Sequence, residues 1–315
     1  MDSLVYSLNA TIPVFLVIVV GYILKQIGML NGDFVKCANK FNFSVTLPVL
    51  LFVDLSSTDI IGDFDLTYVL FCAIVTTVVF FALWIGARCF LKDKQLIGEF
   101  VQSSYRSSAA ILGVAFIQNI YGDSGMAPVM IIGCVPLFNI FAVLALTFEG
   151  GNSSKGAEHI KKSVINIAKN PIIIAIVLGV IASLIKTDFP EIVDKTLSSF
   201  SKMASPLALI TIGAGFEGKK AIAKIKPTVA AAFIKLMVLP GIFLPLAVKL
   251  GFRDQALVAL IIMLGSPTTP SSYIMAKNMG HEGVLTSSVV VMTTLLSSVT
   301  LTLWIFVARY FGYIM

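Results

Sequence analysis

Residues 265–280 read GSPTTPSSYIMAKNMG and lie inside an apolar stretch long enough to cross a membrane. The segment contains Pro267, Pro270 and five serine or threonine residues. Proline has no backbone N–H and clashes with the preceding helical turn, so a helix that reaches this segment is expected to break. Carbonyl groups freed by a break are costly in hydrocarbon unless polar groups satisfy them. The segment is therefore either a kink stabilised by neighbouring helices or a polar site inside the membrane.

The composition around this segment indicates an integral membrane protein. Of the 315 residues, 57% are hydrophobic and only 13% are charged, about half the charged fraction of a soluble domain. The first residues lack the basic region of a cleavable signal peptide, so the first apolar run is expected to be a retained span. The net charge of +6 does not indicate a nucleic-acid partner, because the basic residues gather in particular loops.

Residues for enzymatic chemistry are scarce. The cysteines and histidines are Cys37, Cys72, Cys89, Cys134, His159 and His281. The cysteines form no CxxC pair, and the chain contains no HExxH, P-loop or GxGxxG pattern. We therefore expect no enzyme, no metal site and no cofactor.

Apolar stretches indicate ten membrane spans. Eight are strong and lie near 8–27, 66–87, 98–120, 127–148, 167–186, 227–249, 255–278 and 286–308. Two weaker runs, near 40–57 and 197–216, carry polar residues and fill the gaps between strong spans. The count of ten depends on these two weaker runs.

Charged residues predict the orientation of the ten spans. With the N-terminus outside, fourteen basic residues fall at inner loops and helix ends and five at outer ones. The only charged residues in the 54–65 loop are aspartates. Basic residues favour the cytoplasmic side. We therefore expect a multi-pass protein of the plasma membrane with both termini outside.

A constant offset of 158 residues relates the two halves of the chain. The matched pairs are Pro13 and Pro171, Gly21 and Gly179, Pro48 and Pro206, Gly122 and Gly280, and Gly125 and Gly283. Residues 1–157 and 158–315 then form two repeats of five spans, and the odd number makes the second repeat inverted. Inverted repeats are typical of secondary transporters, whose substrates bind near the midplane where broken helices meet. The partner of 265–280 under this offset is 107–122, SSAAILGVAFIQNIYG.

Several segments resemble the auxin efflux carrier family. They are SPTTPSSYIMAKNMGHEGVLTSSVVVMTTLLSSVT (266–300), NPIIIAIVLGV (170–180), MASPLALITIGAGF (203–216) and KLMVLPG (235–241). The resemblance covers essentially the whole chain. It implies an all-α membrane fold of ten transmembrane helices, built as two inverted five-helix repeats whose fourth and ninth helices break and cross. It also implies that helices 1, 2, 6 and 7 form a scaffold and helices 3–5 and 8–10 a transport bundle, in a homodimer.

The fourth span departs from the family pattern. Arg106, Ser108 and Gly113 occupy matching positions, but Ser108 replaces an asparagine and Ala115 replaces a proline. A break in this helix would then depend on serine and alanine, and an unkinked helix remains possible there.

Two basic residues are expected deep inside predicted spans, and each has two possible roles. Arg106 lies inside the fourth span, where a guanidinium needs a partner or a water-filled cavity. It either clamps a carboxylate or pairs structurally with Glu99 or with carbonyls of a broken helix. Lys235 lies inside the eighth span, where it either neutralises an anion or takes part in ion coupling, or else snorkels or pairs locally.

The ninth span provides most of the other candidate site residues. A helix that restarts after Pro270 would direct the free N–H groups of Ser271, Ser272 and Tyr273 towards a carboxylate, although hydroxyls bonding back to a kinked helix would give the same sequence. Asn139 lines the same cavity or joins two helices. The candidate substrate-binding residues are Arg106, Ser107, Ser108, Asn139, Lys235, Pro267, Thr268, Thr269, Pro270, Ser271 and Ser272.

Charge favours an anionic substrate. Glu99, Glu149 and Asp54 are placed near helix ends, so two deep cations and no deep carboxylate are expected. The prediction is a secondary transporter that moves a small mono- or dicarboxylate, auxin- or malate-like by resemblance, through elevator-like alternating access. A coupling ion, proton or sodium, is possible. The alternatives are a passive anion channel and a ligand sensor built on a carrier fold.

Overall fold

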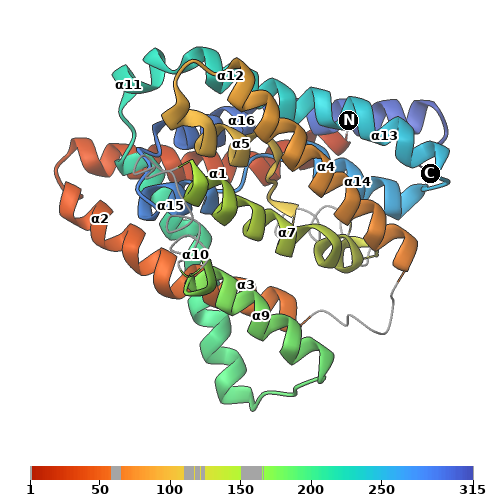
Figure 1. Cartoon of the computed structure of the whole chain (residues 1–315), viewed down its shortest axis with the longest axis horizontal. Helices are drawn as coiled ribbons and strands as arrows, with labels where there is room; N and C mark the ends of the chain where they lie inside the picture. The colour runs from red at the N-terminus through yellow and green to blue at the C-terminus, as the bar shows by residue number, and fades with distance from the viewer. Residues whose placement is uncertain are drawn as a thin grey trace.

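The computed structural model describes residues 2–57, 65–109, 117, 121, 125–149, 165 and 167–314, and these residues are all helical or in connecting turns (Figure 1). The helices of the first half are α1 (Asp2–Gln26), α2 (Gly32–Phe41), η1 (Asn42–Thr46), α3 (Leu47–Ser56), α4 (Leu66–Phe90), η2 (Lys94–Leu96), α5 (Ile97–Tyr105) and α7 (Ala127–Phe148). Here η1 is a π-helical turn that joins α2 to α3 without a break. The weaker span predicted at 40–57 is therefore part of a helix.

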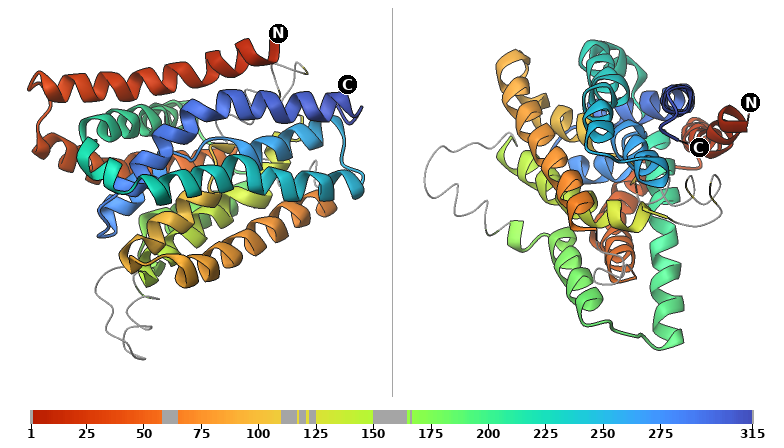
Figure 2. Two further views of the ribbon diagram at one scale, coloured as in Figure 1. Left: turned by 90° about the horizontal axis from the view of Figure 1, so that it is seen from above. Right: turned by 90° about the vertical axis from the view of Figure 1, so that its right-hand side faces the viewer.

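The second half has a similar order of long and interrupted helices. They are α9 (Pro171–Leu184), α10 (Glu191–Ala214), α11 (Gly218–Ala223), α12 (Ile225–Phe233), η3 (Ile234–Val238), α13 (Leu239–Lys249), α14 (Asp254–Gly265), α15 (Ser271–Asn278) and α16 (Val284–Tyr310). The weaker span predicted at 197–216 belongs to α10. The start of α1 and the end of α16 lie at the same end of the bundle (Figure 2).

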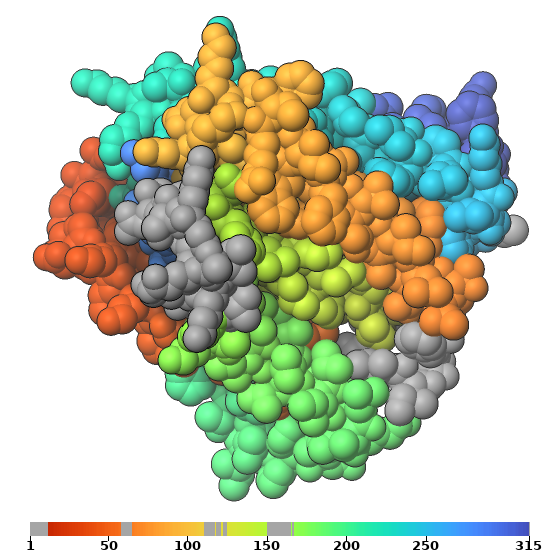
Figure 3. Space-filling view, in the orientation of Figure 1, coloured from red at the N-terminus to blue at the C-terminus, as the bar shows by residue number. Residues whose placement is uncertain are grey.

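The long helices are apolar enough to cross a bilayer. Four described stretches meet this requirement, namely α4, α7, the continuous run Ile225–Lys249 and α16. One side of α4, which crosses the face in Figure 3, leaves a row of large apolar side chains exposed, Leu70, Ile74, Val78, Phe81 and Ile85. Spacings of three and four residues place this row on one face of the helix. An exposed apolar row of this length is the surface that lipid would cover, as expected for an integral membrane protein.

Small residues let helices from the two halves pack closely. A Cβ atom at Gly21 of α1 would overlap the carbonyl oxygen of Ile210 in α10. At Gly179 of α9 it would lie 3.1 Å from the carbonyl oxygen of Phe52 in α3. The helix pairs α1 with α10 and α3 with α9 are therefore in backbone contact.

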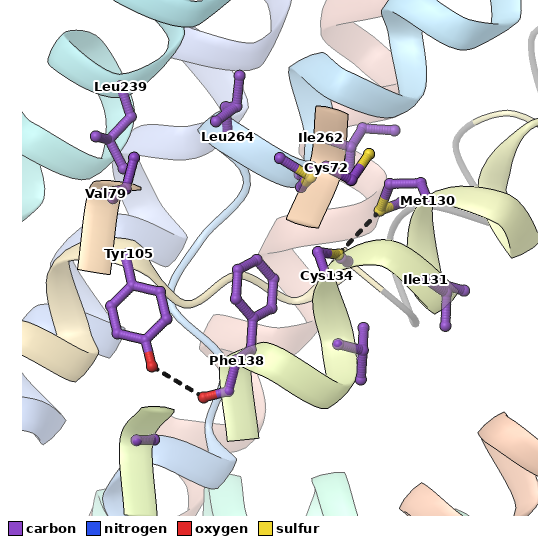
Figure 4. Close-up of a cluster of buried hydrophobic side chains, with 14 of the residues drawn as sticks. Cys72, Val79, Tyr105, Met130, Ile131, Cys134, Phe138, Leu239, Ile262 and Leu264 are labelled. Atoms are coloured by element: carbon purple, nitrogen blue, oxygen red, sulfur yellow. Dashed lines mark hydrogen bonds between the residues drawn. The ribbon is translucent and has the colours of Figure 1, made fainter. Parts of the chain in front are cut away.

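A second group of helices encloses an apolar core. Side chains from α4, α5, α7, α13 and α14 meet there (Figure 4). Phe80 and Phe141 stack with ring centroids 4.4 Å apart, and the Tyr105 hydroxyl donates to the carbonyl oxygen of Phe138 at 2.9 Å. These contacts hold the C-terminal end of α5 against α7, and the helix break begins at the next residue.

Candidate binding site

The break predicted in 265–280 is confirmed, because α14 ends at Gly265 and α15 begins at Ser271. Ser266 adopts an extended conformation with φ −73° and ψ 161°, as expected for a residue that precedes proline. Its N–H still donates to the carbonyl oxygen of Ile262 at 3.0 Å. The proline positions thus set where the helix stops, and residues 266–270 cross the site without regular helix.

A second break interrupts the fourth predicted span without any proline. Residues 106–108 are not helical, and Arg106 is extended with φ −66° and ψ 144°. The predicted break is therefore present in the N-terminal part of the fourth span. Most of the remaining span, including Gly113 and Ala115, lies outside the described residues.

The two breaks supply hydrogen-bond partners for each other's backbone groups. The Ser108 N–H donates to the carbonyl oxygen of Pro267 at 3.0 Å. The Thr268 hydroxyl donates to the carbonyl oxygen of Ser103, in the last turn of α5, at 2.7 Å. Backbone groups that a broken helix frees must find partners in a membrane. The meeting of the two breaks supplies these partners, which explains how the fourth span can stop without a proline.

Arg106 lies at this meeting point and is only 2% exposed. Its Nη2 donates to Oδ1 of Asn139 at 2.8 Å and to Oγ of Ser271 at 3.0 Å. Its Nη1 donates to Sδ of Met275 at 2.9 Å and more weakly to Oε1 of Gln102 at 3.5 Å. Its Nε–H has no acceptor within the described part of the chain. The guanidinium is thus buried against neutral groups and keeps an unused donor.

The structural pairing of Arg106 with Glu99 is not formed. The Glu99 carboxylate instead accepts from the N–H of Gly283 at 2.9 Å and from the N–H and hydroxyl of Thr286, each at 3.0 Å. These groups belong to the N-terminus of α16, where a carboxylate is stabilised by the helix dipole. Glu99 is therefore already engaged, and none of the ion pairs found among the described residues includes Arg106.

A cavity of about 50 Å³ opens beside Arg106. It is lined by residues of α3, α7 and α10 and by both breaks, including Ser107, Ser108, Thr269 and Ser271. The Ser107 hydroxyl has no partner among the described groups. One water needs about 10–15 Å³ on this measure, so the cavity has room for a few waters or a small polar molecule.

Most of the predicted site residues meet here, but not all of them line the cavity. Arg106, Ser107, Ser108, Asn139, Thr269 and Ser271 line it. Thr268 bonds to α5 and to Thr293. Pro267 and Pro270 shape the break. Lys235 does not line this cavity and bonds to the end of α14.

Two of the three N–H groups that were expected to be free are bonded within α15 and the turn before it. The N–H of Ser272 donates to the carbonyl oxygen of Thr269 at 3.0 Å, and that of Tyr273 donates to Pro270 at 3.1 Å. The expectation of free donors was wrong for these two residues, because the first turn of α15 tightens and uses them itself. The positive charge at the site comes from Arg106.

Sequence reasoning missed two contributors. Gln102 donates from Nε2 to the carbonyl oxygen of Ser272 at 3.0 Å, and its spacing of four residues from Arg106 within the predicted fourth span was an available signal. Asp54 of α3 lines the cavity. Asp54 lies two residues before the end of α3, near a helix end as expected, but that helix end itself borders the cavity, which the sequence did not indicate.

Interrupted apolar helices whose breaks meet inside the bundle are typical of one class of protein, the secondary membrane transporters. Comparison with known proteins gives the family. The family model described as membrane transport protein matches residues 6–305. The chain belongs to this family, which is the auxin efflux carrier family. Membership of a transporter family implies a role other than catalysis.

Relatives of this chain are similar over almost their whole length. An uncharacterized transporter, YfdV, of Escherichia coli is 26% identical over 97% of this chain and 99% of its own. An uncharacterized transporter of Methanothermobacter thermautotrophicus is 24% identical over 95% and 97%. A putative malonate transporter of Rhizobium meliloti is 24% identical over 95% of this chain and 94% of its own.

Proposed function

We propose that this protein is a secondary transporter of a small organic anion, with the anion bound at the meeting of the two helix breaks. The observation that carries the proposal is Arg106, a buried guanidinium whose bonds go to neutral groups and whose Nε–H is unused. An arginine at this depth costs at least about 2.5–3.5 kcal/mol. A carboxylate that enters the cavity would supply the missing negative charge and a charge-assisted hydrogen bond.

A short carboxylate fits the site best. The cavity is small and carries hydroxyls beside the guanidinium, at Ser107, Thr269 and Ser271. A relative is named a putative malonate transporter. We therefore propose malonate or a similar short carboxylate as the substrate class, with an auxin-like aromatic acid requiring the cavity to widen.

The proposed architecture is ten spans in two inverted repeats of residues 1–157 and 158–315. The contact between Gly21 and Ile210 becomes that between Gly179 and Phe52 when the offset of 158 is applied to both residues. This correspondence supports the repeat, because equivalent residues then make equivalent helix contacts. The α1–α10 and α3–α9 pairs would form the scaffold, and the helices around the breaks would move against it in a homodimer.

Two alternative functions differ from a carrier in measurable ways. A passive anion channel would pass the same ions without saturation. A ligand sensor would bind the anion without carrying it across the membrane. Counterflow separates the three, because only a carrier exchanges internal for external substrate.

The proposal is tested with purified protein. A panel of mono- and dicarboxylates is screened for a rise in melting temperature, since a ligand that binds the folded state stabilises it. The best ligand is then used for counterflow in proteoliposomes. Saturable exchange of the same acid supports the proposal, and a rise in melting temperature without exchange indicates a sensor.

A further inference from the structure

Lys235 occupies an unusual position for a lysine. It is fully buried, with 0% exposure, and its Nζ donates to the carbonyl oxygens of Leu264 at 2.7 Å and Met263 at 3.2 Å. These two carbonyls belong to the last turn of α14, directly before the break at 266–270. No carboxylate within the described ranges forms an ion pair with Lys235.

The local structure of the eighth predicted span holds the ammonium at this point. Lys235 lies in the π-helical turn η3 (Ile234–Val238), which ends two residues before Pro240. The proline has no N–H for the carbonyl of Leu236 four residues earlier, and Nε1 of Trp304 donates to that carbonyl at 2.9 Å instead. The π-turn is therefore anchored to α16, and the lysine side chain extends from a fixed backbone to the end of α14.

Carbonyl oxygens at the C-terminal end of a half-helix attract cations for two reasons. They have no intrahelical donor, and the helix dipole places negative charge there. In sodium-coupled carriers with broken helices, such oxygens coordinate the coupling sodium ion. In this chain the ammonium of Lys235 already occupies the end of α14.

We propose that Lys235 takes the place of a coupling sodium ion at the broken ninth span. The lysine fixes the end of α14 and so positions the following residues, including Thr269 and Ser271, beside Arg106. The charge is covalently part of the protein, so anion binding does not require sodium. This inference rests on the proposed function for its anion-binding readout but not for its stability readout.

The first test uses the unaltered protein. Its melting temperature, and its affinity for malonate as probe, are measured in sodium chloride and in choline chloride of equal concentration. We expect both quantities to be unchanged. A fall in malonate affinity of about tenfold or more in choline would overturn the proposal. If malonate does not bind in either salt, the proposed substrate is wrong, while the stability measurements still test Lys235.

The second test removes the ammonium of Lys235 from the end of α14. Lys235→Ala leaves space for a cation beside the two carbonyls, and Lys235→Met fills the space with an uncharged chain of similar length. We expect both variants to melt lower than the parent in choline chloride. Sodium or ethylammonium chloride should raise the melting temperature of Lys235→Ala but not of Lys235→Met. An equal response of the two variants to these cations, or a Lys235→Met protein as stable as the parent, overturns the proposal.

Discussion

The Arg106 guanidinium donates from Nη2 to Oδ1 of Asn139 at 2.8 Å, and Nδ2 of Asn139 donates to the carbonyl oxygen of Val135 at 2.9 Å. The second bond fixes the amide so that its oxygen faces the arginine. A neutral oxygen orients the guanidinium without cancelling its charge. The arginine is thus held in place and remains able to attract an anion.

Asn139→Asp is predicted to weaken anion binding, because the new carboxylate would compete with the ligand for Arg106. The new carboxylate would lie where Oδ1 now accepts from Arg106 and would form a buried ion pair with it. We expect malonate affinity to fall by about tenfold or more, because the internal carboxylate competes with the ligand. The melting temperature reports the balance between the counter-charge that Arg106 gains and the lost bond from Nδ2 to the carbonyl oxygen of Val135.

Isothermal titration and thermal melting of the same sample check this prediction. Asp33→Asn, at an exposed position in the first turn of α2, is the control for a change of one charge. Undiminished binding by Asn139→Asp would show that the ligand does not need the charge of Arg106.

Removal of both prolines is predicted to abolish transport without unfolding the protein. Pro267→Ala/Pro270→Ala should allow α14 and α15 to join in one helix, because alanine favours helix by about 3 kcal/mol per residue over proline. The Pro267 carbonyl would then no longer face Ser108, and the cavity would lose its shape. We expect normal expression and no counterflow. Transport at the parental rate would show that the two prolines only bend the helix and are not needed for substrate binding.

Thr269 offers a direct probe of access to the cavity. Its side chain is partly exposed and lines the cavity. Thr269→Cys, made after Cys37 and Cys89 are replaced by serine because both are exposed, should react with a small polar thiol reagent. Bound malonate should slow the reaction. A thiol that remains inert, or whose rate malonate does not change, argues against a ligand in this cavity.

Close helix contact makes Gly213 sensitive to any side chain. A Cβ atom there would overlap the carbonyl oxygen of Ile18 and approach the N–H of Tyr22 in α1. Gly213→Ala should therefore push α1 from α10 and destabilise the protein by about 1–3 kcal/mol. Gly86→Ala is the matched control, because Gly86 is also helical and has nothing within 4 Å. Melting curves of the two variants should differ clearly, and similar curves would contradict the contact.

The orientation of the spans is predicted from charge and is tested by labelling. In the background without Cys37 and Cys89, Lys220→Cys should resist an impermeant thiol reagent added outside intact cells. Lys249→Cys should react, since it is exposed and is assigned to the outer side. Labelling of the Lys220→Cys protein from outside would reverse the orientation and remove support for an inverted second repeat.

The break in the ninth span was predictable because proline acts locally. Pro267 and Pro270 determine the backbone of their neighbours whatever packs around them. The break at Arg106 was less certain, since no proline is present there. It is stabilised by Thr268 and Pro267, more than 150 residues away in the sequence. The offset of 158 residues paired the two segments, but no pattern in the sequence indicated which of their backbone groups would bond.

The partners of charged side chains were also predicted less well, because they too lie far away in the sequence. The contact of Glu99 with the start of α16 and the contact of Lys235 with the end of α14 both depend on which helix ends lie nearby. The sequence indicated that each charge was deep or near a helix end. It could not indicate which distant backbone group each one reached.

The central claim is that Arg106 binds the carboxylate of the substrate. The most direct test is titration of malonate into the parent protein and into Arg106→Gln, with Arg88→Gln as a control at an exposed arginine. We predict that Arg88→Gln binds as the parent does. We predict that Arg106→Gln shows no measurable binding while its melting temperature without ligand stays close to that of the parent, because it removes an unneutralised buried charge. An Arg106→Gln protein that is well folded and binds malonate with parental affinity would contradict the account.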